Sequence, residues 1–563
     1  MLPRNEFGPW NPGIQSLVPQ ELLHLATIFR TENVFTSMAS AAELRGLTGF
    51  GLSELVVFRP QRLALHELLV RVTADFAVPD GTRIEDLGLN FREIARLLLS
   101  QYLGPQMDAI VGAYERVRQD AKRTIDAAVS RLSRGWGPEQ VAEFERLAFS
   151  AGDSIEAAAY RSLARTMCAL FASQGHAWGT KELIASMAAN LACNDFGSDC
   201  IGRTIAPLLR NAATEQGYKL LPRQEHPVVI NTKGPSASGK STLRPLLKKL
   251  AGDIGVQWSD FALISPDIWR KQLLDYASLG AAYKYAGAFT SDELQIVDQK
   301  LDRYMANKHQ RGEMSHLLID RFRFDSFAAD SVEAGSNLLT RFGQSVYLFF
   351  MITPPEMLVE RAWKRGLEVG RYKAVDDTLA HAVEAYSGIP DVFFTWVRRS
   401  DKRIRFEFLD NTVLLGQRPR TVAFGDNETF NVLDVKATLD IERYARIDVE
   451  ATAAEFLYSD RAQLSPDRNV DFLRRCVETF RRVNFADQAS GRVYLRIERG
   501  TPIVKDAAAF DSAARTPDTL AGIRAVAPEA LEGGVPDAQQ AHYLRAQEGA
   551  NPLPSLGQWG RQP

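Results

Sequence analysis

One segment in the middle of the chain restricts its fold more than any other. The run VVIN at 228–231 is apolar and β-branched, and GPSASGKS at 234–241 is rich in glycine and serine. A pattern of leucine and lysine with helical spacing then continues to residue 252. This order matches G-x-x-x-x-G-K-[ST] in the strand, loop and helix context that the motif requires. It predicts a phosphate-binding loop (P-loop) after a buried strand of an α/β domain.

The residue types of this loop suit the binding of a nucleotide phosphate. Gly234 and Gly239 let successive backbone N–H groups curl around a β-phosphate, and the following helix adds the positive end of its dipole. Lys240 reaches the β- and γ-phosphates, and the Ser241 hydroxyl can ligate Mg²⁺. The sequence therefore predicts a site for ATP with Mg²⁺. The loop residues of this site are Gly234, Pro235, Ser236, Ala237, Ser238, Gly239, Lys240, Ser241 and Thr242.

Four more apolar runs follow the loop and alternate with helical patterns. This alternation is typical of an α/β domain, so we predict a parallel sheet flanked by helices. Ligands of such sheets bind at the carboxyl ends of the strands, and chemistry is therefore expected in the residues directly after each run. The runs lie at 261–265, 316–320, 346–352 and 405–411.

Two aspartates stand at such strand ends. Asp267 follows the second run, where Ser265 and Pro266 already supply an N-cap and a first helical residue. Its carboxylate could then accept the proton of an attacking hydroxyl or hold a metal ion, with capping of the next helix as the alternative. We predict the catalytic role. Asp320 ends the third run in the place of a Walker B acid; it either organises Mg²⁺ through water or pairs with Arg321 or Arg323.

A group of cations follows the fourth run. Arg361 and Arg365 are four residues apart, so they share one face of a helix. Arg371 and Lys373 follow in a segment that begins after glycine. Arginines on a lid can neutralise the charge that spreads over a transferring phosphoryl group, and we predict Arg361, Arg365 and Arg371 as catalytic residues. The alternative is a solvated basic helix whose partners are glutamates.

The texture of the sequence divides the chain into four parts. Residues 1–220 form a mainly helical region, read as a scaffold or interaction region, and 221–415 form the domain with the P-loop. Residues 416–500 form a small mixed α/β region. Residues 501–563, rich in Ala, Pro, Asp and Gln, have the composition of a partly disordered tail.

Composition excludes some classes of protein. The 67 Lys and Arg residues balance 69 Asp and Glu residues, so there is no global basic surface for nucleic acid. No apolar run approaches the length of a membrane helix, and the first residues lack the order of a secretory signal peptide. Four cysteines in 563 residues predict reduced thiols rather than a disulfide framework, and one pair spaced as Cys193 and Cys200 is a poor zinc motif.

The order of these parts resembles the zeta-toxin branch of P-loop kinases, which is related to polynucleotide kinases. More narrowly, ELQIVDQKLDRYM, HLLIDRFRFDSFA, RAWKRGLEVGRYKAVDD and AVEAYSGIPDVFFTW are similar to the AvrRxo group of type III effectors of plant pathogens. The resemblance covers about residues 220 to 415 and does not explain the first 160 residues.

This resemblance implies a function. It implies an ATP- and Mg²⁺-dependent kinase of the P-loop kinase fold that phosphorylates the 3′ hydroxyl of the adenosine ribose of NAD. Lys240 and Ser241 would take the P-loop roles, Asp267 that of the base, and Arg361, Arg365 and Arg371 those of the lid. It also implies a small protein antitoxin or chaperone as partner. The location would be the bacterial cytoplasm or, after injection, a host cell.

Other readings of the sequence stay open. The acceptor could be a UDP-linked amino sugar or the 5′ end of a polynucleotide, although the absence of an aromatic and basic stripe disfavours nucleic acid. A different class is an interaction protein that only senses a nucleotide. The acidic residue at 267 disfavours pure sensing, and the intact Lys240 and Ser241 disfavour a degenerate adaptor.

Overall fold

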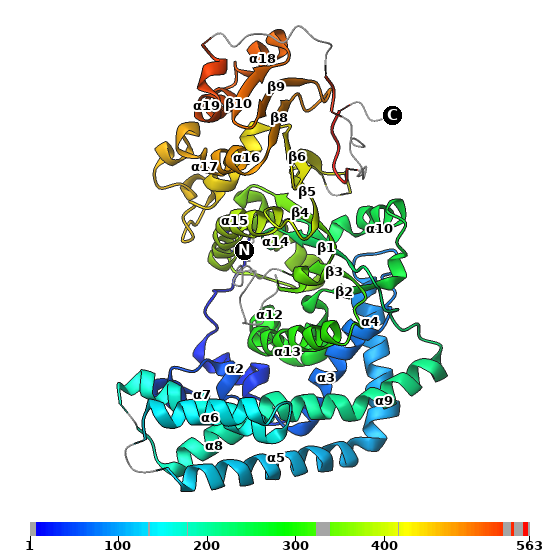
Figure 1. Ribbon diagram of the computed structural model, residues 1–563, viewed down its shortest axis with the longest axis vertical. Coiled ribbons are helices and arrows are strands. Elements are labelled where there is room, and N and C mark those ends of the chain that lie inside the picture. Colours follow the sequence, from blue (N-terminus) through cyan, green and yellow to red (C-terminus); the bar gives the residue numbers. More distant parts are fainter. Residues whose placement is uncertain are drawn as a thin grey trace, which may run out of the picture. The chain divides into compact units, whose positions relative to one another are not determined.

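The computed structural model describes residues 7–132, 136–176, 178–321, 338–414, 416–532, 542–544 and 555–560. The chain divides into two compact units (Figure 1). The sheet unit consists of Met1–Leu17, Leu221–Ser265 and Met305–Pro563, and the helical unit of Val18–Leu220 and Pro266–Tyr304. Residues 266–304, which the sequence suggested as part of the P-loop domain, thus belong to the helical unit. No described helix is both long and apolar enough to cross a membrane.

The helical unit is built from amphipathic helices with ordinary caps. In α7, for example, the Ser154 hydroxyl accepts a hydrogen bond from the Ala157 N–H, and Gly175 ends the helix with a φ of +73°. Helices α5 to α8 lie side by side and bury one apolar cluster (Figure 1). The α-helices of the unit are α1 (Met38–Thr48), α2 (Leu52–Leu55), α3 (Pro60–Asp75), α4 (Asp86–Leu97), α5 (Met107–Ser130), α6 (Pro138–Ser150), α7 (Ile155–Gln174), α8 (Lys181–Ala192), α9 (Ser198–Gln216), α11 (Arg270–Leu273), α12 (Ala286–Phe289) and the first part of α13 (Ser291–Gln310).

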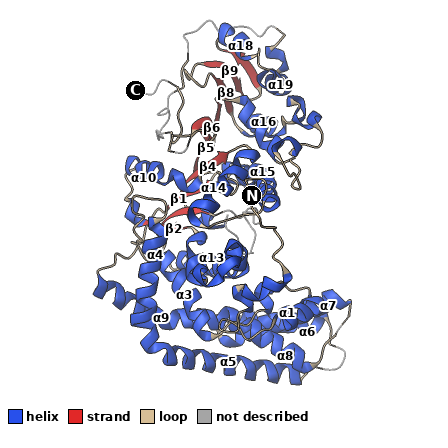
Figure 2. Ribbon diagram, turned by 180° about the vertical axis from the view of Figure 1, so that it is seen from behind, coloured by secondary structure: helices blue, strands red, loops and turns tan. Residues whose placement is uncertain are grey.

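The sheet unit contains a mixed ten-stranded sheet in the order β10-β9-β8-β7-β6-β5-β4-β1-β3-β2 (Figure 2). Strands β2, β3, β1, β4 and β5 are parallel to one another, which confirms the five strands and the parallel pairing expected from the sequence. The strands are β1 (Val228–Lys233), β2 (Phe261–Ile264), β3 (His316–Asp320), β4 (Ser345–Ile352), β5 (Arg403–Asp410), β6 (Arg420–Asp426), β7 (Thr429–Val432), β8 (Arg482–Ala486), β9 (Val493–Glu498) and β10 (Thr501–Val504).

The part of the chain after residue 415 continues the same sheet and core. β6 pairs with β5 in the antiparallel direction, and β7 and β8 then pair in parallel. The ring of Phe393 in α15 lies 4.8 to 6.0 Å, between centroids, from the rings of Phe350, Phe406, Phe408, Phe430, Phe472 and Phe480. The helices of the unit are α10 (Arg244–Asp253), α14 (Pro355–Val369), α15 (Val375–Val397), α16 (Val435–Tyr444), α17 (Asp471–Thr479), α18 (Ala507–Ala513) and α19 (Pro517–Val526).

The residues that the sequence suggested as a disordered tail contribute to this sheet. β10 pairs with β9, and residues 555–560 return to the start of β6. There Gln558 accepts from the Thr421 N–H and donates its own N–H to the Pro419 carbonyl oxygen. The buried carboxylate of Glu407 in β5 accepts from two backbone N–H groups of this returning segment. Trp559 packs into a buried apolar cluster, which the composition of residues 501–563 did not indicate. Its cluster consists of Leu433, Ala486, Val493, Leu544 and Trp559.

A buried charge network ties α3 to α13 inside the helical unit. Arg62 donates to the Glu293 carboxylate through Nε at 2.6 Å and Nη2 at 2.7 Å. The His66 ring lies between Glu293 and Lys300, with Nε2 2.6 Å from Glu293 Oε1 and Nδ1 3.3 Å from Lys300 Nζ. Lys300 also donates to the Ser198 hydroxyl at 2.7 Å. Since an ammonium group only donates, His66 accepts at Nδ1 and donates from Nε2, which is the neutral ring.

We expect this network to make the protein sensitive to acid. Burial and the Lys300 charge lower the pKa of His66 from 6.5 to about 4. A folded-state pKa below the unfolded value stabilises the fold above pH 6.5, and this stabilisation is lost as the pH falls toward 4. The free energy of unfolding should fall by on the order of 2 kcal/mol between pH 7 and pH 5 through this residue. Urea denaturation followed by circular dichroism at several pH values measures it.

The matched variants for this test are His66→Gln and His24→Gln. Glutamine at 66 keeps an N–H donor for Glu293 but does not titrate, so the loss of stability between pH 7 and pH 5 should become shallower. His24 is exposed, and its replacement should leave the pH dependence unchanged. An equal slope in wild-type protein and His66→Gln would show that His66 is not the responsible group.

Candidate functional site

The glycine-rich loop lies at the point where the sheet topology reverses. From β1 at the centre, the chain moves to one side to form β2 and β3, and then to the other side to form β4 and β5. Such a reversal leaves room for a ligand at the carboxyl ends of the strands. In the pairing of β1 with β3, Thr232 lies opposite Asp320, so the acid at the end of β3 stands beside the start of the loop.

Backbone conformation explains the residue types in the loop. Gly234 has φ +152° and Gly239 has φ +95°, and both values are unfavourable for residues with a side chain. A Cβ atom on Gly234 would lie 2.8 Å from Cβ of Met351, and one on Gly239 would lie 2.3 Å from Nδ2 of Asn411. Ala237 also has a positive φ, +65°. Such alternation of backbone conformation turns successive N–H groups to one side and forms an anion-binding concavity.

The polar side chains of the motif bind the backbone of the loop and the end of β3. The Lys240 ammonium group donates to the carbonyl oxygens of Gly234 and Pro235, each at 2.9 Å. The Ser241 hydroxyl donates to Oδ2 of Asp320 at 3.0 Å. This contact brings the Asp320 carboxylate next to the Ser241 hydroxyl, the other oxygen that the sequence suggested for Mg²⁺.

The residues present fit a magnesium ion that is bound together with a phosphate. Mg²⁺ is held by one or two protein oxygens plus waters and substrate phosphates, and Ser241 with Asp320 supplies such a pair. The described residues contain no group of three or more His, Cys, Asp or Glu side chains that could form an all-protein metal site. Within the described part of the chain, the buried hydroxyl of Ser238 has no hydrogen-bond partner. An orphaned donor inside this loop suits a phosphate oxygen.

Sequence reasoning missed two residues that contact the loop. Asn411, directly after β5, donates from Nδ2 to the carbonyl oxygen of Ser238 at 2.7 Å. Thr353, directly after β4, donates to the same oxygen at 3.4 Å. Thr353 is itself fixed by Tyr386, whose hydroxyl accepts from the Thr353 N–H and donates to its carbonyl oxygen. Their positions at the ends of predicted strands were the only signal available in the sequence.

The three arginines predicted for the lid lie on α14 or directly after it. Arg361 lies on α14 and donates from Nη2 to the carbonyl oxygens of Asn411 at 2.6 Å and Val413 at 3.3 Å. Burial lowers the pKa of its guanidinium from the ordinary value. Arg365 lies one turn further along α14, and Arg371 follows Gly370, the residue that ends this helix with φ +74°. Arg361 therefore supports the loop after β5 in this structure.

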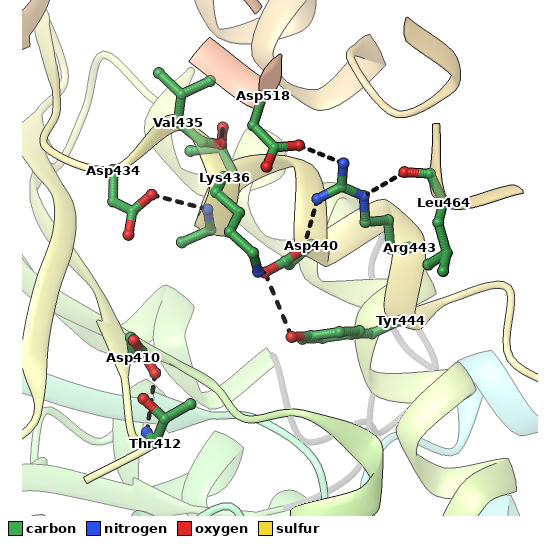
Figure 3. Close-up of polar contacts among 12 residues, drawn as sticks. Asp410, Thr412, Asp434, Val435, Lys436, Asp440, Arg443, Tyr444, Leu464 and Asp518 are labelled. Carbon is green, nitrogen blue, oxygen red and sulfur yellow. Dashed lines mark hydrogen bonds and ion pairs between the residues drawn. The ribbon is translucent and has the colours of Figure 1, made fainter. Parts of the chain in front are cut away.

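Residues of the C-terminal region also hold the segment that follows β5. Arg420 at the start of β6 donates to Oδ2 of Asp410 at 2.8 Å and to Oδ2 of Asp434 at 3.0 Å. Asp410 in turn accepts from the Thr412 N–H. Figure 3 shows Asp410 with Thr412 and Asp434 at the start of α16. It also shows Arg443 in the last turn of α16, where the guanidinium pairs with Asp440 and Asp518. Residues after 415 thus help to set the end of β5.

Asp267 lies in the helical unit, three residues after the end of β2. It belongs to the 3₁₀ helix Pro266–Trp269, and its exposed carboxylate accepts from Nε of Arg270 at 2.9 Å. Arg270 also donates to the Gly287 carbonyl oxygen at 2.6 Å and to the Thr290 hydroxyl at 2.8 Å. This ion pair holds the carboxylate in place.

Comparison with protein-family models, with curated proteins and with solved structures finds no match for this chain.

Proposed function

We propose that this protein is an ATP- and Mg²⁺-dependent kinase that phosphorylates a hydroxyl group of a nucleotide-like small molecule. The observation that carries the proposal is the contact of Ser241 with Asp320, made where a glycine-rich loop leaves the central strand of a parallel sheet. A helix dipole, left-handed glycines and an adjacent lysine complete the features that phosphate binding needs.

In the proposed reaction each of these residues has a separate task. Lys240 would exchange its two carbonyl partners for the β- and γ-phosphates of ATP. Mg²⁺, when bound, neutralises the charge of these phosphates, and Ser241 with a water on Asp320 would hold it. The acceptor oxygen forms a bond to the γ-phosphorus while the bond to the β,γ-bridging oxygen breaks, so ADP leaves. Asp267 would take the proton of the acceptor hydroxyl.

The acceptor is proposed from the resemblance stated above. The resemblance to the AvrRxo group points to NAD, with the 3′ hydroxyl of the adenosine ribose as the nucleophile and 3′-NADP as the product. Arg365 and Arg371 would neutralise charge on the transferring group. On the same basis we propose that the protein acts as a bacterial toxin or type III effector with a small protein partner.

The experiment incubates the purified protein and Mg²⁺-ATP with one of three acceptors: NAD, a UDP-linked amino sugar or an oligonucleotide with a 5′ hydroxyl. Mass spectrometry identifies the product, and phosphorus NMR locates the new phosphate. We expect phosphorylated NAD. A phosphorylated product from another acceptor would replace NAD but keep the kinase. Binding of ATP without phosphorylation of any of the three would instead favour a nucleotide-gated interaction protein.

Lys240→Ala tests whether the glycine-rich loop is the donor site. Removal of one preorganised cation should lower the rate of transfer by roughly 10²- to 10³-fold. Lys249→Ala is the matched control, because Lys249 lies exposed on α10, the helix that follows the same loop. Equal activity of the two variants would place ATP binding elsewhere in the molecule.

A further inference from the structure

One carbonyl group in the glycine-rich loop is held from two neighbouring strand ends. The Ser238 oxygen accepts from Nδ2 of Asn411 at 2.7 Å and from Oγ1 of Thr353 at 3.4 Å. All three residues are buried. Because the donors follow β5 and β4, two strands of the same parallel sheet, they are fixed to the frame from which the loop also starts.

The direction of this carbonyl group determines the direction of the next N–H group. In a planar trans peptide the C=O of Ser238 and the N–H of Gly239 point to opposite sides. While Asn411 holds the oxygen, the Gly239 N–H faces away from the end of β5. Rotation of this peptide would replace a donor by a negative carbonyl end, which repels an anion. Such a rotation changes ψ of Ser238 and φ of Gly239, and it is conformationally accessible because the glycine at 239, with φ +95°, can adopt either sign of φ.

Asn411 is itself firmly placed. Its backbone N–H donates to the Ile352 carbonyl oxygen at 3.0 Å, and its carbonyl oxygen accepts from Arg361 at 2.6 Å. Its amide packs directly against Gly239, where even one added Cβ atom would lie 2.3 Å from Nδ2. The side chain therefore has little freedom to follow a rotating peptide, and the Ser238 carbonyl is confined instead.

We infer that Asn411 is a positioning residue for the phosphate groups of the nucleotide. Its amide fixes the Ser238 carbonyl and so keeps the Gly239 N–H available to the phosphate, while Arg361 acts through Asn411. This inference rests on the proposed function, because it assumes that the loop binds a nucleotide. Asn411 does not touch the reacting atoms in this account. Its contribution is to the affinity for phosphate and not to the affinity for the nucleoside.

Asn411→Leu tests the inference with a neutral side chain of similar shape that cannot donate. Isothermal titration calorimetry measures the Kd of ADP with Mg²⁺ and, by competition, the Kd of adenosine. We expect the Kd of ADP to rise roughly tenfold, the effect of about one hydrogen bond, and the Kd of adenosine to stay within about twofold. A merely structural role would weaken both ligands together or neither.

One further variant tests the second donor to the Ser238 oxygen, and another controls for the exchange of asparagine by leucine. Thr353→Val removes the weaker donor and should raise the Kd of ADP by a smaller factor. Asn307→Leu makes the same exchange at an exposed position of α13 and should change neither Kd. Wild-type affinity for ADP in Asn411→Leu would overturn the inference alone. If wild-type protein bound no ADP at all, the proposed function would fall and the inference with it.

Discussion

Asp267→Asn is expected to lower the rate of phosphoryl transfer by roughly 10²- to 10⁴-fold, the usual contribution of a general base. The amide of asparagine can still accept from Nε of Arg270 through Oδ1, the contact that the carboxylate makes at 2.9 Å. It cannot accept the proton of the acceptor hydroxyl. Binding of ATP should therefore stay close to wild type. Steady-state kinetics with NAD and calorimetry with ADP separate the two effects.

Asp275→Asn provides the matched control for this variant. Asp275 belongs to the same helical unit and accepts from the Ala277 N–H at 3.0 Å as an N-cap, a role that asparagine performs equally well. Its activity should equal that of wild type. An Asp267→Asn enzyme that works within about threefold of the wild-type rate would mean that another group takes the proton.

Gly239→Ala is expected to lower kcat/KM for ATP by roughly 100-fold, the scale of a small displacement at a site of phosphoryl transfer. Two separate costs apply. The backbone at φ +95° disfavours any residue with a Cβ, at about 1 to 3 kcal/mol. The new methyl group would also lie 2.3 Å from Nδ2 of Asn411 and 3.2 Å from Oγ1 of Thr242. The contact with Asn411 is relieved only if its amide, which binds the Ser238 carbonyl oxygen, or the loop itself moves.

Gly252→Ala is the control, measured by the same kinetics and by thermal unfolding. Gly252 lies within α10, and a Cβ atom there would meet nothing within 4 Å. Alanine should raise the helix stability by roughly 0.5 to 1 kcal/mol and leave kcat/KM unchanged. Equal kinetics of the two variants would show that the loop conformation is unimportant for ATP.

Local patterns predicted the elements around the site because each element is encoded by adjacent residues. The apolar run at 316–320 is β3 at the same residues. The sequence predicted that the backbone bends around a phosphate at Gly234 and Gly239, and both residues have positive φ values. The position of Asp320 beside the loop follows from parallel pairing of strands that the sequence already suggested.

Contacts between segments that are far apart in the chain could not be predicted from the sequence. The pattern of apolar and polar residues around position 415 does not indicate that β6 pairs with β5. Nor does it indicate that β7 and β8 pair in parallel across a long connection. For the same reason Asn411 was not recognised, because its role depends on the carbonyl of Ser238, 173 positions away. The contacts of Arg361 with the carbonyl oxygens of Asn411 and Val413 were not predictable either, because they too join residues about 50 positions apart.

The continuous sheet limits how this protein can have been assembled from older pieces. A gene fragment that ended after β5 would encode an open strand edge, which invites aggregation. It would also leave Phe393 without the rings of Phe430, Phe472 and Phe480. Exchange of the C-terminal region by recombination would therefore have to supply an antiparallel strand and matching aromatic residues at once. Substitutions in the aromatic cluster on one side of residue 415 are therefore expected to need compensating substitutions on the other side.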